Sequence, residues 1–158
     1  MGKREKPIIS GDNTGWRPLI CHAATVSWLA LVLHYAWENV QCRFFFIHRV
    51  NLADPWSMLQ AAGGDVILTW IAHLVTAAFT GRWLWLHGRW TRRVWVALFG
   101  TALVLSITIE TYALATERWA YTANNPRLPL FEVSLLPVLQ LLLLFPLIFF
   151  LARRWRWM

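Results

Sequence analysis

An ionisable pair, His34 and Glu38, lies inside the first long apolar run of the chain. A charged side chain at the centre of a bilayer costs about 2.5–3.5 kcal/mol, so such residues usually face a bundle interior or an aqueous cavity. The spacing of four places both on one helix face, about 6 Å apart along the axis, and Ser27 and Gln41 continue this stripe. The pattern predicts a functional site. The alternative is a structural pair that holds this helix against its neighbours.

The composition indicates an integral membrane protein. The chain has 158 residues, enough for one domain, and 58% of them are hydrophobic. The apolar share of an ordinary soluble domain is about 45–50%. The net charge of +7 would suit a nucleic-acid-binding protein. Because membrane topology explains the arginine excess better, we expect no nucleic-acid partner.

Four apolar segments are long enough to cross a bilayer, which takes about 20 helical residues. Asp54 followed by Pro55 predicts the start of the helix that leads into the second span. The basic and aromatic segment 41–54 suits the membrane interface. The expected fold class is an all-α, integral membrane four-helix bundle. Its expected spans are residues 18–40, 61–86, 94–115 and 129–152, preceded by a tail at 1–17 and followed by a basic C-terminal end at 153–158.

The distribution of Lys and Arg predicts that both termini are cytoplasmic. Eleven of the fifteen lie in the N-terminal tail, the 82–93 region and the C-terminal end, and four lie in the two other connections. Cytoplasmic loops of membrane proteins carry an excess of positive residues. We therefore expect a multi-pass protein of the bacterial inner membrane, with the 41–60 and 116–128 connections on the opposite side.

No metal or cofactor is expected. Haem ligated by His34 and His73 would need both at one level, but their expected depths differ by about 9 Å. A transition metal on His34, Glu38 and a neighbour is a further alternative. Cys21 and Cys42 lie about 32 Å apart along the first span, too far for a disulfide, so we expect free thiols.

Four carboxylates are expected at a similar depth in the outer half of the bundle. Glu38 and Glu132 lie about 3 Å from the outer ends of their spans, Asp65 about 6 Å and Glu110 about 7.5 Å. When carboxyls share an apolar pocket, one can stay a neutral acid while another is an ionised base. This arrangement predicts acid–base chemistry without a metal. The alternative is a polar rim at the membrane surface.

The chain resembles the emopamil-binding (EXPERA) family of sterol isomerases and related sigma-2-type receptors over residues 18–152. The matching features are the His-x-x-x-Glu of His34 and Glu38, Asp65 early in the second span, Glu110 in the outer part of the third, and an aromatic-rich fourth span. The resemblance implies buried acids that protonate one end of a double bond and remove a proton elsewhere, while aromatic side chains shelter the cation. Membrane carotenoid cyclases with carboxylate-bearing spans are a second likeness.

We therefore expect a cofactor-free isomerase or cyclase that acts on a sterol, isoprenoid or carotenoid-like lipid olefin. Glu38 and Glu110 would be acid and base in either order, His34 would set the proton state of Glu38, and Asp65 would complete the charge balance. The alternative is a non-catalytic lipid-binding protein or a small accessory subunit of a larger membrane complex; a homodimer is a further expectation. The residues expected to bind the substrate are Trp37, Thr69, His73, Ser106, Glu132 and Gln140.

Overall fold

The computed structural model describes residues 17–48 and 54–155. Of the tail expected at 1–17, only Arg17 belongs to the described residues. Residues 156–158 of the expected basic C-terminal end, and 49–53 of the expected interfacial segment, also lie outside them.

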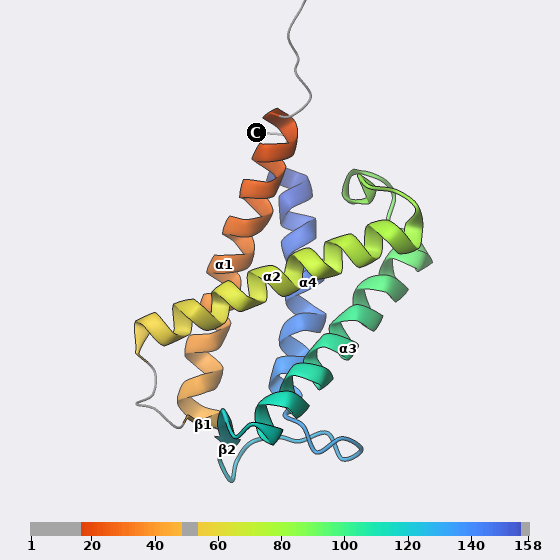
Figure 1. Ribbon diagram of the computed structural model, residues 1–158. Helices are drawn as coiled ribbons and strands as arrows, with labels where there is room; N and C mark the ends of the chain where they lie inside the picture. Colours follow the sequence, from red (N-terminus) through yellow and green to blue (C-terminus); the bar gives the residue numbers. More distant parts are fainter. Residues whose placement is uncertain (1–16, 49–53, 156–158) are drawn as a thin grey trace, which may run out of the picture.

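Four long helices form a bundle (Figure 1). The helix α1 (Arg17–Phe45) packs against α2 (Pro55–Thr80) and α4 (Leu135–Trp155), and α3 (Arg92–Ala115) packs against the same two helices. The helices therefore close a ring in chain order. All four are long and apolar enough to cross a membrane. The predicted all-α bundle of four long apolar helices, each able to cross a membrane, is confirmed.

The two ends of the bundle carry different connections. The first turn of α1 and the last turn of α4 lie at one end (Figure 1). The short antiparallel strands β1 (Phe46–His48) and β2 (Trp119–Tyr121) lie at the other end, with Phe46 opposite Tyr121. The ends of α1 and α3 and the start of α4 lie at the β1–β2 end, whereas α2 crosses α1 and α4 obliquely (Figure 1).

The first helix is longer than the expected span 18–40. It continues to Phe45, through residues expected at the membrane interface. No Gly or Pro interrupts this stretch, so the backbone hydrogen bonding has no reason to stop at Val40. As a result, Gln41 and Cys42 remain on the helix that carries Glu38.

The second helix begins where the sequence predicts and ends earlier. The carboxylate of Asp54 accepts hydrogen bonds from the backbone N–H groups of Trp56 and Ser57, each at 3.3 Å. The helix stops at Thr80 rather than at Leu86, because Gly81 adopts the left-handed conformation, with φ of 65°, that terminates helices. The residues beyond it form a turn and the 3-10 helix η1 (Trp85–His87).

The fourth helix begins at Leu135, later than the expected residue 129. The backbone N–H of Leu128 instead donates to the carbonyl of Val133 at 2.8 Å, and Glu132 has a positive φ of 53°. These features form a tight turn that is incompatible with helix. Glu132, expected on the fourth span, is therefore an exposed loop residue.

Apolar side chains fill the bundle and also cover its outside. The buried core includes Trp85, Leu98, Phe145 and Phe149. Large apolar side chains on the helices' outer faces remain exposed, as expected for surfaces that contact lipid. These include Ile20, Val32, Ile67, Phe79, Val96, Val104 and Leu143.

Candidate functional site

The polar stripe of α1 faces the bundle interior. His34 is fully buried, and Glu38 and Gln41 are 8% and 6% exposed. Glu38 is a multiply bonded carboxylate: Oε1 accepts from Gln41 Nε2 at 2.7 Å, and Oε2 accepts from the Cys42 thiol at 3.2 Å. Ser27 does not take part, because its hydroxyl accepts a hydrogen bond from Trp70 nearer the other end of α1.

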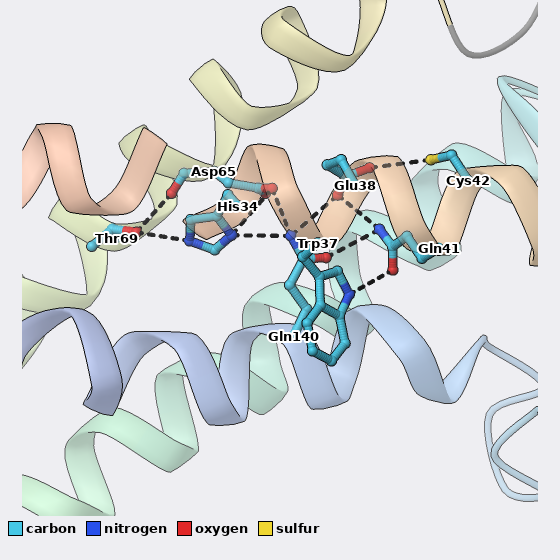
Figure 2. Close-up of polar contacts among 8 residues, drawn as sticks. All are labelled: His34, Trp37, Glu38, Gln41, Cys42, Asp65, Thr69 and Gln140. Carbon is cyan, nitrogen blue, oxygen red and sulfur yellow. Dashed lines mark hydrogen bonds and ion pairs between the residues drawn. The ribbon is translucent and has the colours of Figure 1, made fainter. Parts of the chain in front are cut away.

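The amide of Gln140, on the first turns of α4, joins three helices (Figure 2). Its Nε2 lies 3.0 Å from Nδ1 of His34, 3.1 Å from Oε1 of Glu38 and 2.8 Å from Oδ2 of Asp65. Its Oε1 accepts from Nε2 of Gln41 at 3.1 Å. The expected direct coupling between His34 and Glu38 therefore runs through an amide of a different helix.

The other ring nitrogen of His34 faces Thr69 of α2. The hydroxyl of Thr69 donates to the backbone carbonyl of Asp65 at 2.8 Å. Its oxygen is therefore the acceptor in the 3.3 Å contact with Nε2 of His34, so Nε2 carries a hydrogen. This arrangement fixes the ring orientation and leaves Nδ1 facing Asp65 and Gln140.

The hydrogen-bonding pattern requires a proton between His34 and Asp65. The Gln140 NH₂ group has two hydrogens, but three acceptor atoms surround it. Nδ1 of His34 lies 3.4 Å from Oδ2 of Asp65, so one shared proton removes the shortage. Either an imidazolium beside the Asp65 carboxylate or a protonated Asp65 beside a neutral ring fits. Within residues 17–48 and 54–155, no Lys or Arg forms an ion pair with this cluster.

A second proton-bearing contact lies on the opposite side of the bundle. Glu110 of α3 is 2% exposed and accepts a hydrogen bond from the hydroxyl of Tyr121, a residue of β2. The Tyr121 oxygen in turn accepts from the backbone N–H of Ser134 at 3.0 Å. Burial, and then the bond to Glu110, hold the pKa of Tyr121 above its usual range. The phenol is thus a stable donor to Glu110.

A cavity of about 730 Å³ joins the two contacts. Glu38, Asp65 and Glu110, from three helices, line it together with Gln140. Its other walls are largely apolar or aromatic, and Arg118 also borders it. Apolar walls around a few convergent polar groups are typical of a small-molecule site. Lining residues outside the predicted site include Gln41, Cys42, Phe46, Met58, Leu68, Tyr112, Trp119 and Leu141.

Five of the ten predicted site residues do not line this cavity: His34 and Thr69 are buried beside its polar residues, and Trp37, His73 and Glu132 lie elsewhere. Glu132 lines a groove outside it, beside β2, because the chain turns there instead of forming helix. His73 lies two turns further along α2 than Asp65, and its ring packs 5.5 Å from that of Trp85. Trp37 is partly buried, but it points to Gln41, to which its indole N–H donates at 2.9 Å.

Ser106 and Thr69 have local roles. Ser106 lines the cavity, but its hydroxyl donates to the backbone carbonyl of Ala102. Thr69 is fully buried behind His34. Ser106 therefore touches the cavity directly, whereas Thr69 positions a residue of the cluster.

Besides residues that line the cavity, sequence reasoning missed two side chains that hydrogen-bond the carboxylates. Cys42 and Tyr121 contact Glu38 and Glu110, respectively. Cys42 lies four residues after Glu38, so a longer first helix would have placed it on the same face. Tyr121 comes from a loop strand, and no periodic signal in the sequence links it to Glu110.

Comparison of the chain with known protein families, with curated proteins and with solved structures found no match. The geometry of the cavity is therefore the basis for a functional proposal.

Proposed function

We propose that the protein is a membrane-embedded, cofactor-free acid–base isomerase or cyclase that acts on a lipid olefin. The observation that carries the proposal is the cavity of about 730 Å³ lined by carboxylates of three helices. Two of these, Asp65 and Glu110, lie against side chains that hold a proton, His34 and Tyr121. A proton donor and a proton acceptor thus border one lipid-sized space.

The proposed reaction moves protons and leaves the oxidation state unchanged. A protonated carboxyl adds its proton to one carbon of a double bond, which leaves a carbocation on the other. Loss of a proton from a neighbouring carbon to a second carboxylate gives the shifted olefin. In a cyclase, a second double bond attacks the cation before that loss. Aromatic faces at Phe46, Tyr112 and Trp119 line the cavity and suit a cationic intermediate.

The proposed roles follow the hydrogen bonds. Glu38 accepts from three donors, Gln41, Cys42 and Gln140, which fix the orientation of its carboxylate in the site. The His34–Asp65 pair and the Tyr121–Glu110 pair then exchange protons with the substrate. In this assignment Asp65 is a reacting group rather than the charge-balancing residue expected from the sequence.

The test uses deuterium. Membranes from a deletion strain are incubated in D₂O buffer with purified protein, and lipids are compared by mass spectrometry. The active protein should convert one olefinic lipid into an isomer that carries one deuterium on carbon. Glu110→Gln should abolish this conversion because it removes the ionisable proton and keeps the shape. Glu132→Gln, the same change outside the cavity, should retain it. Full conversion by Glu110→Gln would remove Glu110 from the chemistry.

One observation favours a second candidate, a lipid-binding protein or accessory subunit without turnover. Hydrogen bonds connect the side chains of Glu38, Gln41 and Gln140 to one another, as in a structural polar network that holds α1 to α4. In that case the lipid profile of a deletion strain should be unchanged, and a lipid or protein should co-purify with the chain. An accumulated olefinic precursor in the deletion strain would contradict this candidate.

A further inference from the structure

A second cavity lies at the opposite end of the bundle, between the end of α2 and the start of α3. It has a volume of about 350 Å³. Three arginines, Arg82, Arg92 and Arg93, line it together with Thr91 and the buried ring of Trp85. We call this the arginine pocket. The cavity of about 730 Å³ lined by Glu38, Asp65 and Glu110, which we call the acid–base cavity after its proposed function, shares no lining residue with it.

The arginine pocket has no acidic partner in the described part of the chain. None of its three guanidinium groups forms an ion pair there. The acidic residues of that part all belong to the other half of the bundle, near β1 and β2. They are Glu38, Asp54, Asp65, Glu110, Glu117 and Glu132. Three positive charges around one hollow therefore favour the binding of an anion.

The backbone beside the pocket is shaped around one of these arginines. The guanidinium of Arg82 lies so close to Gly88 that a Cβ atom at this position would collide with Nη2. The glycine thus lets the arginine side chain lie across the turn that follows η1. On the other side, Thr91 precedes α3 without making a side-chain cap. The N-terminal end of a helix carries a partial positive charge, which adds to that of the arginines.

Apolar side chains next to the pocket indicate an amphiphilic ligand. Trp83, Leu84 and Trp95 are 60%, 54% and 38% exposed. Exposed Trp beside Arg at the end of a membrane-spanning helix is typical of the bilayer interface. We propose that the arginine pocket binds the phosphate headgroup of an anionic membrane phospholipid, with the acyl chains along the exposed apolar side chains.

The test compares lipids by native mass spectrometry of the full chain released from detergent. The probes are phosphatidylglycerol and phosphatidylcholine with the same acyl chains, and glycerol phosphate without them. The wild-type protein should retain phosphatidylglycerol in preference to phosphatidylcholine. Replacing the three pocket arginines by Gln should weaken phosphatidylglycerol binding about tenfold or more, because charge-assisted contacts to the phosphate are lost.

Two variants distinguish binding in the arginine pocket from attraction by the overall positive charge of this end. The variant Arg89→Gln/Arg153→Gln/Arg154→Gln removes the same charge from the same end, at residues that do not line the pocket. It should keep the preference for phosphatidylglycerol. Gly88→Ala keeps every charge but displaces Arg82, so it should weaken binding by a smaller factor.

Three outcomes would overturn the proposal. One is an equal loss of phosphatidylglycerol binding in the control variant, which would indicate that the lipid is attracted by the overall positive charge of this end rather than by the pocket. Another is an unchanged preference in a pocket variant whose helical circular dichroism matches the wild type. The third is binding of glycerol phosphate as tight as that of the lipid, which would assign the pocket to a soluble anion.

Discussion

Gln140 is the residue on which the buried polar cluster depends. It contacts α1 through His34 and Glu38, and α2 through Asp65. Its carbonyl oxygen also accepts from Gln41, so both ends of the amide are used. Replacing this side chain leaves buried donors and acceptors without partners at several positions at once.

We predict that Gln140→Leu lowers the stability of the folded protein by about 1–3 kcal/mol, the cost of leaving buried polar groups unpaired. Thermal unfolding in detergent, followed by tryptophan fluorescence, measures the change. Gln60→Leu is the matched control, because Gln60 lines the same cavity but is exposed. Similar melting temperatures for the two variants would show that the Gln140 network contributes no stability.

Tyr121 provides a prediction about pH. Burial and the hydrogen bond to Glu110 raise its pKa above the usual range. In a Tyr35→Phe/Tyr112→Phe background, Tyr121 is the single tyrosine of the chain. Its phenolate absorbance should be absent near pH 10, where an unperturbed tyrosine is about half ionised. Glu110→Gln should lower this pKa, because the bond to Glu110 favours the protonated phenol.

The stability contributed by Tyr121 has a defined sign. The folded state holds the phenolic proton more tightly than the unfolded state does, so the contribution is present below pH of about 10 and is lost as the pH rises through the folded pKa. Half-ionisation of Tyr121 near pH 10 in the folded protein would contradict the buried contact with Glu110.

At the scale of elements, Gly81 ends α2, and the arginine-rich turn begins after it. Gly81 has φ of 65° and its N–H group donates to the carbonyl of Ala78 at 3.3 Å. A side chain with a Cβ atom is strained in this conformation. Gly100, inside α3, has ordinary helical backbone and open space around its Cα.

These two glycines predict opposite effects of one substitution. Gly81→Ala should destabilise the protein by about 1 kcal/mol because of the positive φ. Gly100→Ala should be neutral or stabilising by about 0.5–1 kcal/mol, because alanine is the better helix former. Melting temperatures in the same detergent test both. Equal destabilisation would show that Gly100 is needed for close helix packing.

The strands β1 and β2 are the elements that complete the acid–base cavity. Their pairing brings Phe46 next to Tyr121, with ring centroids 5.6 Å apart, and so holds Tyr121 under the end of α3. The side-chain amide of Asn125 fastens this connection by donating to the carbonyl of Phe45 at 2.9 Å. The second proton-bearing contact of the proposed enzyme therefore depends on a loop.

At the scale of the whole molecule, the bundle separates two kinds of chemistry. The carboxylates gather near β1 and β2, and the arginine pocket lies between the end of α2 and the start of α3. The connection between these two helices lies away from β1 and β2 (Figure 1). The arginine excess at that end predicts a cytoplasmic position by the positive-inside rule.

Reporter fusions test this orientation. Fusions at Trp90 and at the C-terminus should report the cytoplasm, and a fusion at Asn124 should report the opposite side. Asn124 lies in the connection between α3 and α4, beyond β2. A cytoplasmic signal at Asn124 would contradict the orientation.

The sequence by itself determined the fold class, because membrane spans need long apolar helices and such segments are visible in composition. It also determined the start of α2, where Asp54 and Pro55 are local signals that do not depend on neighbours. The inward face of α1 followed from the spacing of His34 and Glu38. These features depend on contacts within one segment, or on the difference between lipid and water.

Only the tertiary structure decided which polar groups meet. The Gln140 amide lies 106 positions from His34 in the chain, and Tyr121 reaches Glu110 through a strand pairing that periodicity does not encode. Expected depths placed Glu132 with the other acids, but a tight turn with positive φ keeps it outside. Depth along a helix follows from counting residues, whereas the partner of a side chain depends on how each helix is rotated and tilted against its neighbours, and packing of the whole bundle sets that rotation.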